Sequence, residues 1–264
     1  MTFFTLSDKG KVRENNEDYA ESFCLNKCNA DGSFNNLMVM LLCDGMGGGP
    51  AGERASYLAV ETMKDCILRD YISNGKKEIS NEEYLDKLDT YIQNSHFNIY
   101  REGVENTSLD GMGTTIVAGE IVDDNLLLAH VGDSRGYCYN PSTGLRQLTK
   151  DHSLVQQYVD AGKITPEEAF CHPQRNIITR VLGASCGAPV KVDTRTVPLA
   201  KGDIVLFCTD GLCGVIEDHE ISSILEKFYK DEKADLKLIA NTLISAACLR
   251  GGPDNVTVTL YQHN

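Results

Sequence analysis

The sequence predicts an α+β sandwich in which antiparallel sheets lie between helices. Short apolar runs bounded by turn residues are typical of β-strands, and long stretches with a helical spacing of apolar residues are found between them. The two kinds of element do not alternate regularly, as they would in a parallel α/β fold. Antiparallel sheets covered by helices account for this order.

The strands are predicted where apolar runs meet turn residues. Three of the clearest runs end directly before Asp44, Gly132 or Asp210, and a fourth begins just after Asn255. Four further segments have a β-like composition. The predicted strands cover residues 3–7, 37–43, 115–121, 126–131, 136–140, 191–198, 204–209 and 256–261.

Two helices are predicted between the runs at 37–43 and 126–131. Apolar residues from Ala55 to Ile67 recur at the spacing of one buried helix face. The second helix begins at Ser80, which forms a capping-box pair with Glu83, and continues to Ile99. A last helical pair, residues 218–229 and 234–249, precedes the final strand.

The composition indicates one domain, residues 1–264, without a membrane segment. Hydrophobic residues make up 42% of the chain, and no linker-like or low-complexity stretch divides it. No apolar run approaches the roughly 20 residues that cross a bilayer, and the N-terminal residues carry no targeting signal. We therefore expect a cytoplasmic protein, with its ten cysteines reduced.

The charge balance argues against a nucleic-acid partner. The chain carries 25 basic and 38 acidic residues, a net charge of −13, which repels a polyanion. Most of the acidic excess is typical of a solvated surface. Some of the carboxylates, however, occur in a pattern that predicts a cation site.

Five aspartates follow strands or occupy turns: Asp18, Asp44, Asp133, Asp210 and Asp254. Several strands can place such carboxylates on one rim of a sandwich, where like charges need a cation. Oxygen ligands suit Mg²⁺ or Mn²⁺ rather than Zn²⁺. Any one of these aspartates is more often a turn or cap residue, but their repetition after apolar runs favours a metal site.

Other residues beside these aspartates complete the hypothesis. Gly45 has no side chain, so its carbonyl can approach an ion. Arg13, five residues before Asp18, offers bidentate donors to a phosphoryl group, although a surface ion pair is the commoner role of such an arginine. Two carboxylate-bridged metals supply activated water and positive charge, which hydrolysis of a phosphate ester requires.

Six short motifs together resemble the metal-dependent protein phosphatases, the type 2C or PPM family. Each motif is weak alone, but all six are found in family order from near the first residue to near the last. They are GKVRENNED at 10–18, DGMGG at 44–48, GTT at 113–115, GDSR at 132–135, TDG at 209–211 and GPDNVT at 252–257.

The resemblance implies roles for individual residues. Asp44 would bridge two ions, with the Gly45 carbonyl, Asp210 and Asp254 completing the first site. Asp18 would belong to the second site, and Glu17 would act through metal-bound water. Asp133, together with Asp210, would hold a third and weaker ion, as in bacterial relatives. Arg13 would bind the substrate phosphate.

The resemblance also implies the fold and the partners. The fold would be a four-layer αββα sandwich with two central antiparallel sheets flanked by helix pairs. Residues of about 160–185 resemble the flap of the bacterial branch. The substrates would be proteins phosphorylated on serine or threonine, the chain would oppose a Ser/Thr kinase, and we expect a monomer. Met46 stands where animal members carry a histidine proposed as general acid, so that role stays unassigned.

Two other functions compete with this hypothesis. Residues 47–52 fit the GxGxxG pattern of dinucleotide-binding folds, but a second helix follows where a Rossmann unit returns to a parallel strand. A pseudophosphatase or binding module on the same fold is the second alternative. Retention of every matched metal position argues against it.

Overall fold

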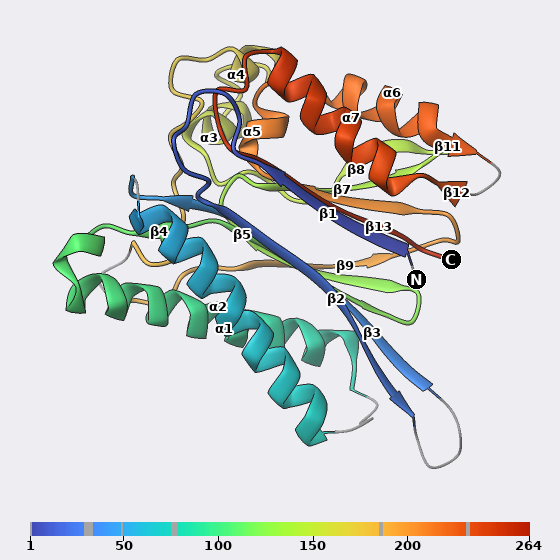
Figure 1. The fold of residues 1–264 in the computed structure, drawn as a ribbon, viewed down its shortest axis with the longest axis horizontal. Coiled ribbons are helices and arrows are strands. Elements are labelled where there is room, and N and C mark those ends of the chain that lie inside the picture. Colours follow the sequence, from blue (N-terminus) through green and yellow to red (C-terminus); the bar gives the residue numbers. More distant parts are fainter. Residues whose placement is uncertain (1, 29–33, 49, 75–78, 185–186, 231–232) are drawn as a thin grey trace.

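The computed structural model describes residues 2–28, 34–48, 50–74, 79–184, 187–230 and 233–264. Two antiparallel sheets lie face to face, with one helix pair on each outer side (Figure 1). This confirms the predicted four-layer sandwich. No helix among these residues is long and apolar enough to cross a membrane.

Each sheet is built from antiparallel neighbours that are far apart in sequence. The first sheet has the order β1 (Thr2–Asp8), β13 (Val256–Gln262), β10 (Ile204–Cys208), β7 (Arg135–Asn140) and β8 (Gly144–Gln147). The second has the order β2 (Asp18–Cys28), β3 (Phe34–Met46), β5 (Ile116–Val122), β6 (Asn125–Val131) and β9 (Asp193–Pro198), with β4 (Gly113–Thr114) beside the end of β3.

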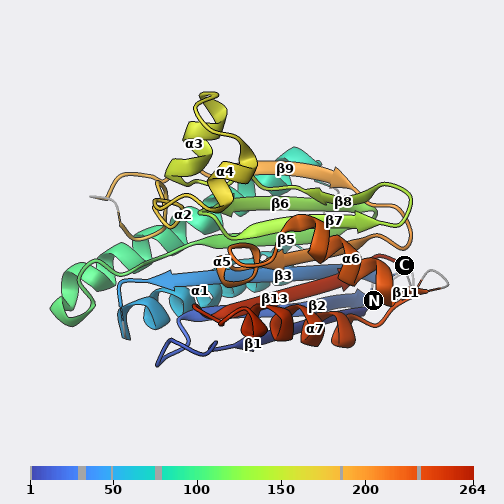
Figure 2. The ribbon, with the colours of Figure 1, turned by 90° about the horizontal axis from the view of Figure 1, so that it is seen from above.

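Long helices cover the outer faces, and short ones lie at one end. The helices α1 (Pro50–Asn74) and α2 (Asn81–Glu105) cover the second sheet, and α6 (Asp218–Phe228) and α7 (Leu236–Leu249) cover the first. Figure 2 shows α3 (Leu154–Asp160) and α4 (Pro166–Phe170) beyond the edge of the sheets. The remaining elements are a 3₁₀ turn at Thr107–Leu109, α5 (Asp210–Cys213), β11 (Tyr229–Lys230) and β12 (Lys233–Ala234).

Strand β3 shows why this sequence builds three buried layers. Leu37, Val39 and Leu41 pack in the core under α1 and α2, whereas Met38 and Met40 pack in the core between the sheets. Successive side chains of a strand point to opposite faces, so a continuous apolar run buries both. A third core joins the first sheet to α6 and α7.

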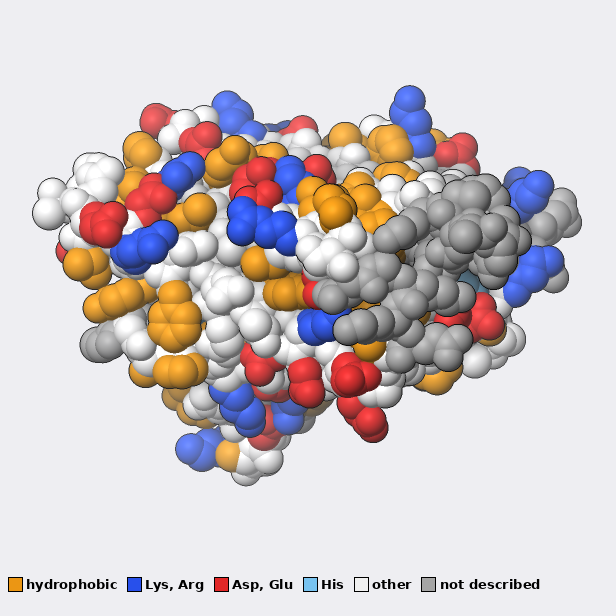
Figure 3. Space-filling view, turned by 90° about the horizontal axis from the view of Figure 1, so that it is seen from below, with side chains coloured by type: hydrophobic (Ala, Val, Ile, Leu, Met, Phe, Trp, Pro, Cys, Tyr) orange, Lys and Arg blue, Asp and Glu red, His pale blue; other side chains and the backbone are white. Residues whose placement is uncertain are grey.

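The helix α2 begins as predicted. The Ser80 hydroxyl accepts a hydrogen bond from the Glu83 backbone, and the Glu83 carboxylate accepts one from the Ser80 backbone. Leu88, Ile92 and Ile99 face the core. The outer face of the α1–α2 pair intersperses acidic and basic side chains, as a solvated helix face does (Figure 3).

Several predicted boundaries were wrong. The segment 234–249 becomes helical only at Leu236, because Lys233 and Ala234 pair with Lys230 and Tyr229. The predicted strand at 191–198 begins at Asp193, and the predicted helix at 218–229 ends at Phe228. Strands β2 and β8 were not predicted. The described cysteines whose side chains are placed are free, as expected: Cys24, Cys43, Cys66, Cys138, Cys171, Cys208, Cys213 and Cys248.

Candidate active site

One end of the sandwich collects the five aspartates that the sequence singles out. Antiparallel pairing places Asp18, at the start of β2, opposite Asp44 near the end of β3. Asp133 follows β6, Asp210 follows β10, and Asp254 precedes β13, all at this same end. We call Asp18, Asp44, Asp133, Asp210 and Asp254 the rim carboxylates.

Four of the rim carboxylates, Asp18, Asp44, Asp133 and Asp210, have raised pKa values. Burial raises the pKa of Asp18 to about 7, and the charges of Asp210 and Asp254 add to the shift. Burial and neighbouring carboxylates likewise raise the pKa values of Asp44, Asp133 and Asp210. Without a bound cation, these carboxyl groups therefore keep protons at pH values where isolated aspartates are already ionised.

Asp18 is held by two threonines that the sequence analysis did not single out. The hydroxyls of Thr209 and Thr257 donate to its Oδ2 at 2.9 and 2.7 Å. Its Oδ1 is buried and has no hydrogen-bond partner among the described residues. One carboxylate oxygen is thus fixed, and the other is left for a ligand. The only sequence signal was position, since Thr209 precedes Asp210 and Thr257 lies in the last motif.

Backbone contacts fix Asp44 and Gly45. The Thr115 backbone and the Thr114 hydroxyl donate to the Asp44 carbonyl at 2.9 and 2.8 Å. A Cβ on Gly45 would lie 2.1 Å from the Gly52 carbonyl oxygen. Close packing against the start of α1 therefore requires glycine here, independently of any ion.

Asn255 ties the N-terminal loop to Asp254. Its side-chain nitrogen donates to the carbonyls of Lys9 and Asn15 at 2.9 Å, and its Oδ1 accepts from the Glu17 backbone at 2.8 Å. Gly211 permits a close approach from the other side, because a Cβ there would lie 1.8 Å from the Asn255 carbonyl oxygen. These contacts bring the loops that carry Asp210 and Asp254 together.

Arg13 lies at the same rim. Its guanidinium donates to Asp254 Oδ2 at 2.7 Å, and about half of its side chain is exposed. The charges of Asp254, Glu17 and Asp44 raise the pKa of Arg13 against the opposing effect of burial. The structure thus places a cation with exposed donors beside the rim carboxylates.

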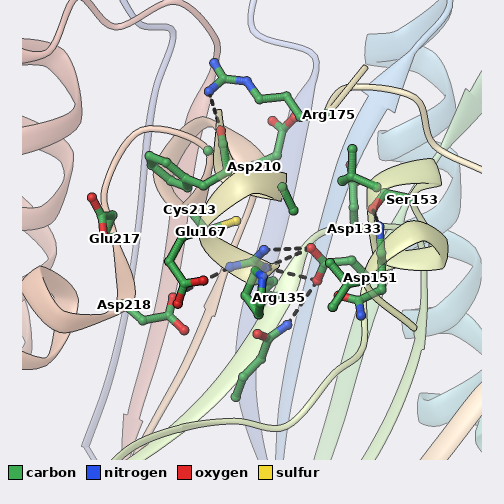
Figure 4. A pocket seen from close by; sticks show the side chains of 18 of the residues that line it. Asp133, Arg135, Asp151, Ser153, Glu167, Arg175, Asp210, Cys213, Glu217 and Asp218 are labelled. Carbon is green, nitrogen blue, oxygen red and sulfur yellow. Dashed lines mark hydrogen bonds and ion pairs between the residues drawn. The ribbon is translucent and has the colours of Figure 1, made fainter. Parts of the chain in front are cut away.

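Asp133 is not the ion-pair partner of Arg135 that a simple turn would provide. The Arg135 guanidinium instead binds Asp151, with hydrogen bonds of 2.7 to 3.0 Å (Figure 4). Asp133 is 6% exposed, and its Oδ1 has no hydrogen-bond partner among the described residues. Although Asp133 and Arg135 are close in the sequence, the structure pairs Arg135 with Asp151 and not with Asp133.

A cavity of about 460 Å³ opens beside Asp133 and Asp210. Its walls are the α3–α4 region on one side and α5 with the start of α6 on the other (Figure 4). Part of the predicted flap, from Pro166 to Asn176, lines it. Met46, where animal relatives were expected to carry a histidine, is 38% exposed.

A separate group of potential ligands lies behind the rim. His130, His152 and Asp193 bring one ligand atom each within 4.8 Å of the others. The Nδ1 of His152 accepts a hydrogen bond from the Gly132 backbone at 3.0 Å. The Arg180 guanidinium donates to Asp193 Oδ1 at 2.8 Å and also lies 2.8 Å from His152 Nε2. Arginine already supplies the positive charge here, and the contacts indicate a structural cluster.

The strand pairing excludes the dinucleotide-binding alternative. β5, the long strand after α1 and α2, pairs antiparallel with β3. A Rossmann unit would place a parallel strand there. Gly47 and Gly48 therefore lie between the end of β3 and the start of α1, and Gly52 lies in the first turn of α1.

Comparison with known proteins identifies the family. The chain matches the family model described as Protein phosphatase 2C over residues 17–247. It is 37% identical over 258 residues to the serine/threonine phosphatase stp of Listeria welshimeri, which covers 98% of this chain and 94% of the relative. The chain belongs to the protein phosphatase 2C family, as the motifs predicted.

Solved structures agree. That of the S. agalactiae serine/threonine phosphatase has a TM-score of 0.83 and 35% identity, with 100% of this chain and 99% of that chain covered. A structure of the catalytic domain of the serine/threonine protein phosphatase PstP in complex with two manganese ions has a TM-score of 0.77 and 33% identity, covering 98% and 96% of the two chains.

Proposed function

We infer that the chain is a protein serine/threonine phosphatase whose rim carboxylates hold divalent metal ions. Family membership and the relatives that are named serine/threonine phosphatases support the reaction. The observation that carries the site is the convergence of carboxylates with raised pKa values around two buried oxygens, Asp18 Oδ1 and Asp133 Oδ1, that lack a hydrogen-bond partner within the described part of the chain. Such oxygens need a cation or a proton.

The donor set suits Mn²⁺ or Mg²⁺, because it consists of oxygens. Asp44 is proposed to bridge two ions, with the Gly45 carbonyl, Asp210 and Asp254 at the first and Asp18 at the second. Glu17 would act through water. A third, weaker ion is proposed at Asp133, with Asp210. The two manganese ions bound to the related PstP support the first two sites.

The chain's own residues prepare the reaction. Bound divalent ions supply positive charge for the phosphoryl oxygens and lower the pKa of a water molecule. Arg13 is proposed to orient the substrate phosphate with its exposed donors. Thr209 and Thr257 hold Asp18 in one orientation, which would leave its other oxygen available to a bound ion. Met46 carries no proton to donate, and no general acid is assigned.

We also propose the substrates and the opposing enzyme. The substrates are phosphoproteins, and a Ser/Thr kinase catalyses the opposing phosphorylation. The chain is proposed to act in the cytoplasm as a monomer and one catalytic domain, residues 1–264, with a flap at about 160–185. The cavity beside Asp133, walled partly by that flap, supports a role of the flap in substrate contact.

Metal removal tests the function. Hydrolysis of p-nitrophenyl phosphate and of a phosphothreonine peptide is expected to require added Mn²⁺ or Mg²⁺, and Zn²⁺ is expected to substitute poorly. Full activity after exhaustive chelation would rule out the metal assignment. Absence of any hydrolysis with Mn²⁺ bound would favour the pseudophosphatase alternative.

A further inference from the structure

The cavity between the α3–α4 region and α5–α6 is larger than a phosphate group needs. At about 460 Å³ it lies within the range of small-ligand pockets, and it begins at Asp133 and Asp210. A substrate with its phosphorylated residue at the rim would extend its neighbouring residues over this cavity. The lining therefore bears on which phosphoproteins the chain accepts.

The cavity wall keeps a net negative charge once the ion pairs among its own side chains are taken into account. Asp151 is neutralised by Arg135, whose guanidinium also lies 3.6 Å from Asp218. Glu167, on α4, and Glu217, at the start of α6, remain exposed around the opening (Figure 4). Hydrogen bonds from its own backbone and from Thr165 lower the pKa of Glu167 and keep it ionised.

Positive charge on the wall is smaller. Arg175 donates to the Phe170 carbonyl at 3.0 Å, and its charge partly opposes the rise in the pKa of Asp210 that burial causes. His219 lies 3.5 Å from Glu217. Arg175 therefore offsets one carboxylate at most, and the outer wall keeps a net negative charge.

The cavity also has an apolar side. Val155, Val159, Pro166, Ala169 and Phe170 line it next to the carboxylates. Lysine and arginine side chains combine an apolar stem with a cationic end, and this lining matches both parts.

The inner end of the cavity lies at the third ion site proposed above. Asp133 is more than nine-tenths buried, lines the cavity, and has an Oδ1 without a partner among the described residues. A buried carboxylate oxygen in this state favours a positively charged or proton-donating neighbour. The inner end thus suits the proposed ion, which leaves the outer, negatively charged wall for a cationic side chain of the substrate.

We propose that this cavity binds a lysine or arginine side chain of the substrate, so that the chain prefers phosphoproteins with a basic residue near the phosphorylated serine or threonine. This inference rests on the proposed phosphatase function. Glu167 and Glu217 are its specificity-determining residues. They contact the substrate beside the reacting group and take no part in the reaction.

The test is a positional scan. A phosphothreonine peptide with alanine at the three positions on either side is compared with peptides carrying one lysine or one glutamate. At low salt, lysine at one or more positions should raise kcat/KM about five- to tenfold, and glutamate there should lower it. The gain should shrink in high salt.

Matched variants locate the effect. Glu167→Gln with Glu217→Gln should reduce the lysine preference to within about twofold, while hydrolysis of the alanine peptide and of p-nitrophenyl phosphate stays unchanged. Glu105→Gln with Asp110→Asn, which changes the net charge equally at exposed sites outside the cavity lining, should keep the preference. Equal kcat/KM for all peptides, or an equal loss in both double variants, would overturn the proposal.

A binding measurement separates this inference from the proposed function. If p-nitrophenyl phosphate is not hydrolysed, the proposed phosphatase function is wrong. Fluorescence anisotropy of the lysine and alanine phosphopeptides still shows whether the cavity binds a basic side chain. The measurement uses the Asp44→Asn variant, because this substitution prevents turnover. The lysine phosphopeptide should bind to it more tightly than the alanine phosphopeptide. Equal affinities would contradict the basic-residue pocket.

Discussion

Arg13 and Asp254 form an ion pair of 2.7 Å at the rim, which joins a proposed phosphate-binding residue to a proposed metal ligand. The two roles compete for one carboxylate. An ion bound at Asp254 would neutralise that carboxylate and would leave the Arg13 guanidinium free for the substrate. Metal binding and phosphate binding should therefore be coupled through this contact.

Replacement of Arg13 by alanine should weaken the binding of the substrate phosphate without weakening the binding of Mn²⁺. Loss of the donors should lower kcat/KM by about 10- to 100-fold, with much of the change in KM if the contact is already made with bound substrate. The affinity for Mn²⁺ should be unchanged or higher, because a competing cation is gone. Arg13→Lys keeps the charge without the bidentate geometry and should recover only part of the activity. Weaker Mn²⁺ binding in Arg13→Ala would contradict this coupling.

Thr257 is predicted to act on metal affinity through Asp18. Thr257→Val removes the hydroxyl that donates to Asp18 Oδ2 at 2.7 Å. Contacts of this kind are worth about 10- to 100-fold in metal affinity, so the Mn²⁺ concentration for half-maximal activity should rise by that factor. The maximal rate at saturating Mn²⁺ should change little.

The control lies two residues further along β13. Thr259 is also buried, but its hydroxyl contacts Thr5 and Ser22 instead of a carboxylate. Thr259→Val should leave the Mn²⁺ dependence unchanged. Equal shifts in both variants would indicate a general effect on the strand.

Replacement of Asp133 tests whether this residue holds a third ion or only forms a turn. If it holds a weak ion, Asp133→Ala should leave two tight ions and a nearly normal melting temperature, while kcat falls by about tenfold or more. If it is only a turn residue, stability should fall by about 1 kcal/mol with unchanged chemistry. The measurement is kcat against Mn²⁺ concentration together with calorimetric stoichiometry. Unchanged kcat and stoichiometry would remove the third site.

The raised pKa values predict how stability depends on pH in the absence of metal. An unfolded aspartate titrates near pH 3.9, whereas Asp18 in the folded chain titrates at about 7. The folded state therefore holds more protons between these values, and the free energy of unfolding should fall as pH rises from about 4 to 7. Mn²⁺ should raise the melting temperature more at pH 8 than at pH 5.

Glu120 provides the control for that experiment. Burial raises its pKa to about 8, so it contributes a similar pH trend away from the rim. In Glu120→Gln this contribution disappears, and the remaining trend should still be abolished by Mn²⁺. A melting temperature of the metal-free variant that rises from pH 5 to 8 would contradict the proposed ionisation of the rim.

The elements that the sequence predicted are those with strong local patterns. β3 and β10 bury both faces and therefore read as apolar runs, and α2 carries its capping box. β2 was missed because it is the edge strand of its sheet and mixes Glu21, Ser22 and Asn26 with apolar residues. Its pairing with β3 supplies what its composition lacks.

The site residues that could be predicted were likewise those with a strong local sequence pattern. Asp44 and Asp210 could be nominated because each follows an apolar run. The partners of Asp18, Thr209 and Thr257, lie 191 and 239 residues away and depend on the pairing of distant strands. The contact of Arg135 with Asp151, 16 residues later, likewise depends on the fold and not on local sequence.

A calorimetric Mn²⁺ titration, with hydrolysis of a phosphothreonine peptide recorded at each step, tests most directly whether the rim carboxylates hold the ions that the reaction requires. The wild-type chain should bind at least two ions, and its turnover should rise with their occupancy. Asp44→Asn, which weakens the ligand shared by both, should bind them much more weakly and lose about 100-fold or more in kcat even at high substrate. Two tightly bound ions in Asp44→Asn, or a near-normal kcat, would show that the metals lie elsewhere.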